Sequence, residues 1–421
     1  MQVIENLIVK EKVYIEKMKN GLTVMIIPKE NTNKKYAIIG THFGSIDNEF
    51  VVPGEEKVSK IPDGVAHFLE HKMFEQENGT NSLDVLSNIG VDANAYTTND
   101  YTAYLIDATN NFDEAFKELM NYVQHPYFTD ENVKKEQGII AQEINMYEDD
   151  PVNRVYMEAL KCMYNVNPVR IDIAGSAESI NEINKETLYS CYNTFYNPSN
   201  MCLVLCGNFE PKEMLIKVEE NIEEKKEQGE IKRIYPEEPE KINLKESDKT
   251  MNVSQPIFVI GIKDNIKTPI TSKKILTIEI ILQILLGKSS RLYKKLYENK
   301  ELILVPDLEY EFSQGFAHVM ISGQAKNPKK IYEEVKKEII EITKEGIKEE
   351  DFERIKKKIY GGYIMEYNDV DIIARSLLAD YFKGIKPFEF IEEFKSLNLD
   401  YANNIMKEIF KEENMIISIV K

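Results

Sequence analysis

The sequence predicts an α+β protein made of two related domains. Its 421 residues exceed what one ordinary hydrophobic core accommodates and suit two domains of about 200 residues each. Both halves end alike, because Asn200-Met201 and the apolar strand that follows resemble Asn414-Met415 and the final strand, 214 residues later. A predicted helix precedes each of these strands. We interpret this as an internal duplication, in which each domain is a mostly antiparallel sheet with helices packed on one face.

A polar stretch separates the two halves. From about residue 223 to residue 250 the chain is rich in Lys, Glu, Pro and Gly and has almost no apolar periodicity, as in a linker. We therefore expect a first domain over residues 1–225, a linker over 226–250 and a second domain over 251–421.

In the first half, alternating apolar residues predict strands at Leu22–Ile27 and Tyr36–Gly44, paired with each other through a polar turn. A helix over Ser82–Ile89 is expected to end at Gly90, whose missing Cβ suits the position after a helix. Alternation over Asp92–Asp107 predicts two more strands. Further on, the sequence predicts helices at 112–124, 130–147, 152–163 and 185–195, and a strand at 201–207.

The second half repeats this mixture of strands and helices. A strand at Pro256–Ile262 and a helix ending at Leu286 are followed by strands within 305–324. Long charged amphipathic helices are then predicted over Pro328–Tyr367 and Asp371–Asn404, before the final strand.

The composition limits where the protein acts and on what. Its hydrophobic content of 43% and charged content of 29% are typical of a soluble globular protein. A net charge of −18 argues against nucleic acid or an anionic membrane surface as a partner. The N-terminus lacks a basic region followed by an apolar one, and no segment approaches 18 uninterrupted apolar residues. We expect a cytoplasmic protein whose four cysteines, which lack C-x-x-C spacing, are buried free thiols.

The stretch from Asp63 to His71 contains the motif H-x-x-E-H. Residues four apart share a helix face, so His67 and His71 would project side by side and could share one metal ion. Glu70 would lie on the flank of that face, within reach of a metal-bound water, which is the position of a general base. Asp63 is the expected N-cap of this helix.

A catalytic zinc site needs a third protein ligand and an open fourth position. The helix expected at 130–147 offers Glu136 and Glu143, two turns apart and about 10 Å apart along the axis. Only one of them can bind the ion, and the other would support a ligand from outside. Helix geometry alone leaves the choice open, and an exposed helix carboxylate is the ordinary role of either.

Together, HFLEH, the glutamate-bearing helix and the segment Asn94-Ala95-Tyr96-Thr97 resemble the insulinase/pitrilysin family of inverted-motif zinc peptidases. The half-length bacterial members, similar in build to the mitochondrial processing peptidase, match best. The resemblance implies that Glu143 is the third ligand of one Zn²⁺ per chain and that Glu136 supports the site. It also implies that Asn94, Ala95, Tyr96 and Thr97 form an edge strand that pairs with the substrate backbone.

The second half departs from the family pattern. It has no H-x-x-E-H, so we expect it to be the non-catalytic duplicate. Many active relatives place an arginine and a tyrosine seven residues apart there, to hold substrate and the oxyanion. Tyr297 and Leu304 take those places in this chain, and Arg291 or Tyr293 is a candidate substitute.

These observations predict a zinc metalloendopeptidase that cleaves short or unfolded peptides. Full-length relatives enclose the substrate in a clamshell chamber of four such domains, so we expect this two-domain chain to form a homodimer or a heterodimer with a related chain. One alternative is a catalytically silent peptide-binding or assembly subunit, although such a chain has no reason to retain the whole set of His and Glu residues. A purely structural zinc site is disfavoured because such sites prefer cysteine.

Overall fold

The structure is a computed structural model that describes all 421 residues. The chain forms two compact units, each assembled from three segments. Unit 1 contains residues 1–144, 172–235 and 364–388, and unit 2 contains 145–171, 236–363 and 389–421. The division at a linker over 226–250 stays a prediction, and the compact units depart from it by exchanging residues 145–171 and 364–388.

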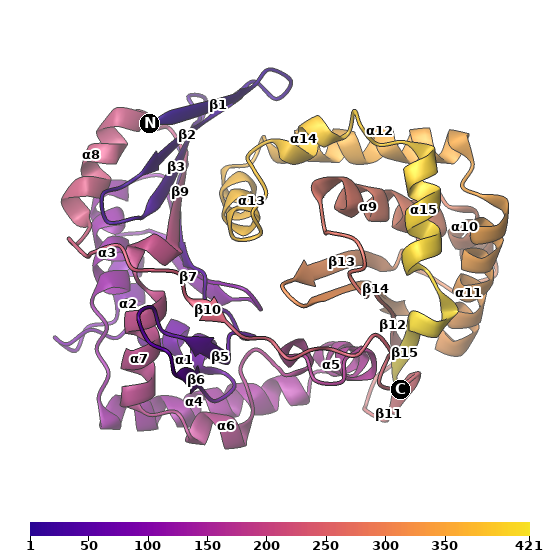
Figure 1. Cartoon of the computed structure of the whole chain (residues 1–421), viewed down its shortest axis with the longest axis horizontal. Coiled ribbons are helices and arrows are strands. Elements are labelled where there is room, and N and C mark those ends of the chain that lie inside the picture. The colour runs from indigo at the N-terminus through magenta and orange to yellow at the C-terminus, as the bar shows by residue number, and fades with distance from the viewer. The chain divides into compact units, whose positions relative to one another are not determined.

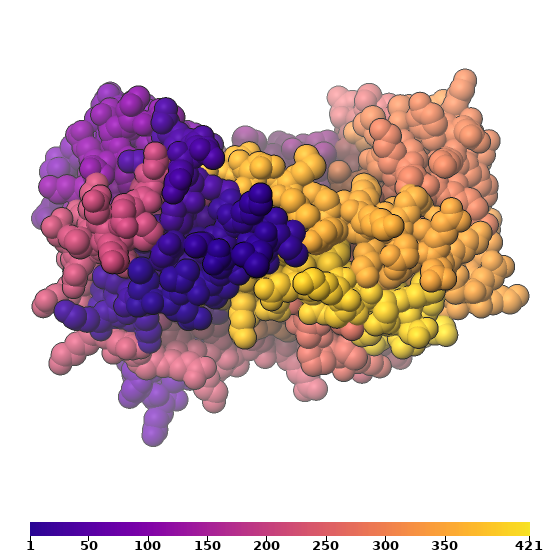
Figure 2. All heavy atoms as spheres, turned by 90° about the horizontal axis from the view of Figure 1, so that it is seen from above, coloured from indigo at the N-terminus to yellow at the C-terminus, as the bar shows by residue number.

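Unit 1 is built on a seven-stranded sheet of order β1-β2-β3-β9-β4-β8-β7 (Figure 1). Its strands are β1 (Gln2–Asn6), β2 (Glu11–Lys17), β3 (Thr23–Pro28), β4 (Lys35–Thr41), β7 (Asp92–Thr97), β8 (Thr102–Ala108) and β9 (Met201–Gly207). Only β3 and β9 run parallel, and every other pair is antiparallel. The indigo N-terminal strands lie at the molecular surface (Figure 2). At the opposite end of the order, β7 is an edge strand with one neighbour, β8.

The predicted pairing of the strands near residues 22–27 and 36–44 is wrong. β9 lies between β3 and β4, parallel to the first and antiparallel to the second. Every residue of β9 is buried, so this apolar strand takes the centre of the sheet, where both of its faces can be covered. The polar turn joins two strands that are next-but-one neighbours.

Most helices of unit 1 pack on one face of the sheet (Figure 1). They are α1 (Val65–Lys72), α2 (Ser82–Asn88), α3 (Phe112–Gln124), α4 (Asp130–Glu148), α6 (Ala177–Asn181), α7 (Lys185–Phe195) and α8 (Pro211–Asn221). Short strands β5 (Glu49–Val51), β6 (Val58–Lys60) and β10 (Lys232–Arg233) form a second, three-stranded sheet. The opposite face of the main sheet is covered at β4 and β9 by α13 (Val370–Phe382) from the C-terminal half of the chain.

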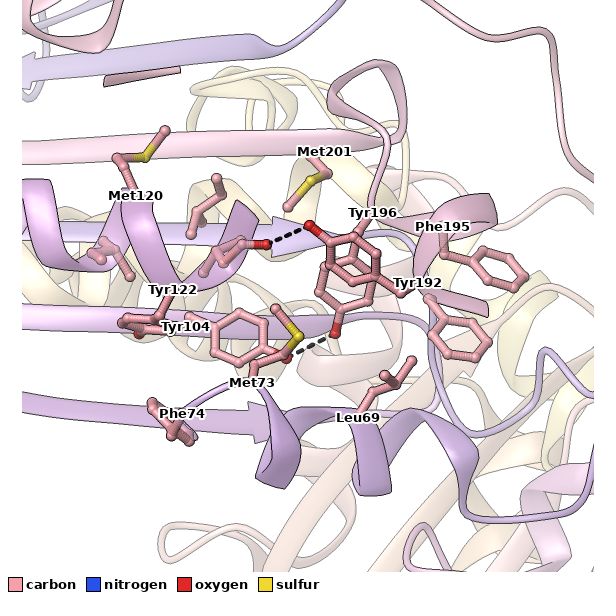
Figure 3. Close-up of a cluster of buried hydrophobic side chains, with 14 of the residues drawn as sticks. Leu69, Met73, Phe74, Tyr104, Met120, Tyr122, Tyr192, Phe195, Tyr196 and Met201 are labelled. Atoms are coloured by element: carbon pink, nitrogen blue, oxygen red, sulfur yellow. Dashed lines mark hydrogen bonds between the residues drawn. The ribbon is translucent and has the colours of Figure 1, made fainter. Parts of the chain in front are cut away.

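An aromatic core lies beneath α1 (Figure 3). Leu69 and Met73 of α1 point into a group of buried tyrosines from β8, α3 and α7. The hydroxyl groups of two of these tyrosines, Tyr104 and Tyr196, form a hydrogen bond with 2.8 Å between the oxygens. Burial of each large apolar side chain contributes about 1.5–3 kcal/mol, so this core fixes the rotation of α1 and leaves its histidine face outside.

Unit 2 repeats the central pattern of unit 1 with a five-stranded sheet of order β11-β15-β12-β14-β13. The strands are β11 (Glu246–Lys249), β12 (Ile257–Lys263), β13 (Asp307–Ser313), β14 (Phe316–Gln324) and β15 (Met415–Val420). Again one pair, β11 and β15, is parallel and the rest are antiparallel. The helices are α5 (Pro151–Met163), α9 (Ser272–Leu286), α10 (Arg291–Glu298), α11 (Pro328–Glu345), α12 (Glu349–Glu366), α14 (Glu389–Glu393) and α15 (Leu399–Ile409).

The two sheets agree in register as well as in order. Gly40 of β4 lies opposite Cys202 of β9, and Gly261 of β12 lies opposite Ile416 of β15. Cys202 and Ile416 are separated by the same 214 residues that separate the two Asn-Met pairs. The predicted fold class, two similar α+β domains with mostly antiparallel sheets, is confirmed.

Each sheet also has a glycine where a helix from the other half of the chain crosses it. A Cβ on Gly40 would lie 2.9 Å from the ring of Phe382 in α13, and one on Gly261 would lie 2.8 Å from the sulfur of Met163 in α5. Glycine has no Cβ, so the exchanged helices can approach the sheets closely at these two positions.

Two expectations about helices need correction. The helix expected over 328–367 is broken into α11 and α12 at Gly346, whose φ of 84° no continuous helix adopts. The helix expected over 371–404 is three helices, α13, α14 and α15. The expected linker contains β10, which pairs with β5, and β11, which pairs with β15. All four cysteines are buried and free, and none of the helices has the length and apolar content that a bilayer crossing requires.

Candidate active site

Helix α1, which carries the motif, begins at a glycine rather than at a capping aspartate. Gly64 occupies the N-cap with φ 90°, and no side chain caps the helix, so the expected role of Asp63 is wrong. The Asp63 carboxylate instead accepts a hydrogen bond from Asn48 Nδ2 at 2.5 Å. A Cβ on Gly64 would lie 2.5 Å from the carbonyl oxygen of Ala174. The chain therefore needs glycine at this entry, both for its left-handed conformation and for space.

Three side chains converge at the exposed side of α1. The Nε2 atom of His71 lies 3.5 Å from one carboxylate oxygen of Glu143, and Nε2 of His67 lies 3.9 Å from the other. One ligand atom from each of the three residues lies within 4.8 Å of the other two. Tetrahedral zinc with bonds of about 2.0–2.1 Å separates its ligand atoms by about 3.3 Å. The donors are too far apart for good hydrogen bonds and close to the separation that a shared ion imposes.

Glu136 contacts His71 at Nδ1, the ring nitrogen that does not face Glu143. Nδ1 of His71 lies 3.1 Å from a Glu136 carboxylate oxygen, and Nζ of Lys72 lies 3.5 Å from the other. With Nδ1–H donating to Glu136, the lone pair of His71 is on Nε2, which faces Glu143. Burial alone would raise the pKa of Glu136, but the His71 hydrogen bond and the Lys72 charge lower it overall. The structure thus separates two glutamates that helix geometry could not distinguish.

The pKa values of the two histidines shift in opposite directions. Burial, and the nearby His71 imidazole, lower the pKa of His67 to about 3. Its Nδ1 is buried without a hydrogen-bond partner. Burial also lowers the pKa of His71, but the Glu136 hydrogen bond and the charges of Glu70, Glu136 and Glu143 raise it overall. His67 is therefore neutral over the whole physiological pH range and can donate a lone pair to a metal ion. At His71, whose pKa is raised, protons compete more strongly with a metal ion for the ring.

Glu70 lies beside this set without belonging to it. Its carboxylate accepts a hydrogen bond from the Thr97 hydroxyl at 2.6 Å, and Thr97 Oγ1 also lies 3.3 Å from Thr102 Oγ1. Burial raises the pKa of Glu70, an effect that the Thr97 hydrogen bond partly opposes. A buried carboxylate with a raised pKa accepts a proton more readily than an exposed one, as acid–base chemistry requires.

The edge strand β7 runs next to α1. Ala93 and Ala95 pack towards the core beneath α1, whereas Tyr96 packs on the opposite face of the sheet. The Ala95 N–H donates to Asn94 Oδ1 at 2.8 Å. In the free protein this backbone donor on the edge strand is thus satisfied by its own neighbour.

The structure brings together the residues predicted from the first half, namely His67, Glu70, His71, Glu136, Glu143 and the Asn94–Thr97 segment. Sequence reasoning missed the contact of Thr97 with Glu70 and the role of Lys72, which is 1% exposed. A lysine directly after the motif gave no sign of burial. The Thr97 contact joins a strand to a helix, so no local spacing could reveal it.

In unit 2, neither expected substitute for the missing arginine and tyrosine is free. The Arg291 guanidinium pairs with Glu338 at 3.0 Å and Glu341 at 2.8 Å, and Tyr293 is buried in the unit 2 core. Tyr297 and Leu304 are exposed, by 56% and 71%.

Comparison with known proteins gives the family. A family model described as insulinase (peptidase family M16) matches residues 58–177, and one described as the peptidase M16 inactive domain matches residues 182–359. The uncharacterized zinc protease YmfH of Bacillus subtilis is 38% identical over 95% of this chain and 94% of its own length. This chain belongs to the insulinase family.

Two solved structures share this fold. An M16-like peptidase from Alicyclobacillus acidocaldarius is 34% identical, with a TM-score of 0.94 and 99% of both chains covered. The periplasmic protease PqqL of Escherichia coli, at 17% identity and a TM-score of 0.75, shares the fold, and this chain covers 47% of it. The chain is thus a half-size insulinase-family protein, as the resemblance implied, and its motif lies within the segment that matches the insulinase model.

Proposed function

We propose that this protein is a zinc metalloendopeptidase that hydrolyses short or unfolded peptides. The observation that carries the proposal is the convergence of His67, His71 and Glu143, with Glu70 held beside them by Thr97. Two imidazole nitrogens and one carboxylate are a catalytic rather than a structural ligand set, because structural sites use cysteine and leave no open position. We assign one Zn²⁺ per chain to these three residues. The zinc protease names of the relatives support the metal.

Zinc bound there would polarise the scissile carbonyl and lower the pKa of a bound water towards 7. The protein's own residues supply the proton transfer. The Glu70 carboxylate takes a proton from the attacking water, and Thr97 fixes its orientation. Glu70 then gives this proton to the leaving amine. Glu136 keeps the His71 ring in one tautomer and one orientation.

The substrate is proposed to bind along β7. An edge strand offers unpaired backbone groups, so a peptide can add to the sheet in an extended conformation. This mode reads the main chain of Asn94, Ala95, Tyr96 and Thr97 and depends loosely on substrate side chains. The carbonyl oxygen of a bound peptide would take the place of Asn94 Oδ1 at the Ala95 N–H. Extended peptides satisfy this requirement and compact folded domains do not.

The test separates metal binding from chemistry. Because Glu70 is assigned as base and not as ligand, Glu70→Gln should keep about one zinc per chain and lose at least about a hundredfold in peptidase rate. Zinc is measured by elemental analysis of the purified protein, and activity by cleavage of a peptide mixture followed by mass spectrometry.

Glu77→Gln, an exposed change shortly after the same helix, is the matched control and should behave like wild type. A Glu70→Gln protein that loses its zinc, or remains active, contradicts the assignment. A silent peptide-binding subunit is disfavoured, because all five His and Glu side chains keep an arrangement that binding alone does not need. Cytoplasmic location and assembly into a dimer remain predictions.

A further inference from the structure

Arg375 of α13 lies next to the edge strand, on the face of the sheet opposite α1. Its guanidinium carbon is 5.2 Å from the centre of the Tyr96 ring in β7 and 5.8 Å from that of Tyr36 in β4. Arg375 is half-buried. The side chain is thus held beside β7 by two aromatic rings, although nearly three hundred residues separate it from that strand in the sequence.

Arg375 has no ion pair with any carboxylate of unit 1. The acid one helical turn before it, Asp371, lies 3.7 Å from Nζ of Lys34, and the same lysine lies 2.9 Å from Asp107. The nearby acids therefore already share a cation. The faces of the two rings attract the positive charge of the guanidinium, and the Tyr36 hydroxyl oxygen can accept from one of its N–H donors. A guanidinium has five N–H donors, so others stay available for a carboxylate. In a chain with a net charge of −18, an arginine kept out of ion pairs beside a strand edge is available to a ligand.

The position of Tyr96 determines which side chains of a peptide bound along β7 could contact Arg375. Side chains alternate along a strand, and Tyr96 faces away from Thr97 and the Glu70 side of the sheet. A peptide added along β7 would place every second side chain on the Tyr96 face. Cβ atoms directly opposite on neighbouring strands are about 4.5–5.5 Å apart, so an acidic side chain opposite Tyr96 comes within reach of the guanidinium.

We propose that Arg375 is a specificity-determining residue that binds the carboxylate of an Asp or Glu side chain in a peptide lying along β7. Arginine suits this task because its planar fork of donors matches a carboxylate. The inference rests on the proposed function, in that it assumes β7 as the substrate strand, and it narrows the substrate class to peptides with an acidic residue at one alternating position.

The test measures binding, so that it does not depend on turnover. The probes are extended decapeptides, blocked at both ends and fluorescently labelled, with a single Asp moved through successive positions and with Asn and Lys counterparts. Fluorescence anisotropy is recorded with the zinc-loaded Glu70→Gln protein. At one position, and not at its immediate neighbours, Asp should bind about tenfold or more tightly than Lys, as a charge-assisted hydrogen bond predicts. Adding Arg375→Glu should reverse this preference, and Arg375→Lys should retain part of it.

Matched variants exclude indirect effects. Lys212→Glu makes the same charge change at an exposed position of unit 1 and should leave the Asp-to-Lys ratio unaltered. Arg375→Gln should abolish the ratio without changing the affinity for the Asn peptide, which shows that β7 is intact. An Asp preference that survives both Arg375→Glu and Arg375→Gln, or no preference at any position, overturns the proposal. The proposed function fails separately, if the protein with Glu70 intact cleaves none of the peptides that it binds.

Discussion

Glu136 and Glu143 show how two identical side chains on one helix can have different roles. Glu143 faces the Nε2 atoms of both histidines, whereas Glu136 contacts His71 Nδ1 and Lys72. We expect Glu143→Gln to abolish tight zinc binding, and Glu136→Gln to weaken it by about 10–100-fold, as is usual for residues that orient a ligand. Competition with a chelator of known affinity measures both. Equal losses in the two variants would contradict the assignment of Glu143, rather than Glu136, as the zinc ligand.

A second residue-scale feature lies in unit 2, where Glu238 holds a loop. Its carboxylate accepts hydrogen bonds from Nζ of Lys263 at 2.6 Å and from the backbone N–H groups of Asn165, Val166 and Asn167 at 2.9 Å each. Burial alone would raise the pKa of Glu238, but these hydrogen bonds lower it to about 2. The folded protein therefore holds this carboxylate in its charged form.

The sign of the resulting pH dependence follows from linkage. The unfolded chain binds a proton at Glu238 at higher pH than the folded protein does, so acid favours unfolding. This stabilisation is complete above the ordinary pKa of 4.5 and is lost as the pH falls towards 2. We expect Glu238→Gln to destabilise the protein by about 1–3 kcal/mol at pH 7 and to narrow its gap to wild type below pH 4. Urea unfolding across this pH range measures the effect, with the exposed Glu237→Gln as control. A constant gap at every pH would show that the charge of Glu238 is unimportant.

Prediction from the sequence is accurate for the part of the site that lies within one helix. It is less accurate where elements that are distant in the chain come together. His67, Glu70 and His71 follow from the four-residue helical repeat, which needs no tertiary information. The choice between Glu136 and Glu143 depends on which turn of α4 faces α1, and spacing alone does not contain that information. Thr97 and Arg375 reach the site region from a strand and from a helix far along the chain, so only the folded structure reveals their contacts.

At the scale of elements, the proposed role of β7 depends on a backbone donor that no neighbouring strand uses. The Ala95 N–H bonds the Asn94 side chain rather than the neighbouring strand, so its removal should cost the sheet little. We expect Ala95→Pro, which lacks this donor, to raise KM strongly or abolish cleavage while zinc stays bound. Ala95→Ser keeps the N–H and serves as control. Unchanged peptide kinetics in Ala95→Pro would place the substrate elsewhere.

The same contrast between local and distant information explains the errors in the predicted elements. The helices α3 and α7 and the strand β9 have the predicted bounds, because periodicity and nearby turn residues define them. The pairing of β3 with β4 was wrong, because a strand from the end of the same half inserts between them. The break at Gly346 was missed because the apolar period of α11 continues into α12, and a single glycine does not tell whether a helix kinks or ends.

At the scale of the whole molecule, the remaining prediction concerns assembly. PqqL is about twice as long as this chain, which covers 47% of it. We expect two chains to associate, as a homodimer or with a related chain, and so to form a chamber that admits unfolded peptides. Light scattering of the purified protein should give a mass near twice 48.8 kDa, or activity should require a partner. A monomer that is fully active and digests folded proteins would rule out the chamber.

The exchange of α5 and α13 between the two compact units has a consequence for the history of the gene. If the two similar halves arose by duplication, the copy without the histidine motif was never dispensable to the fold. Its loss would remove α13 from β4 and β9 and expose apolar side chains such as Ile38 and Val204 to water. Selection for a folded first half therefore preserves the second half as well, whatever that second half binds.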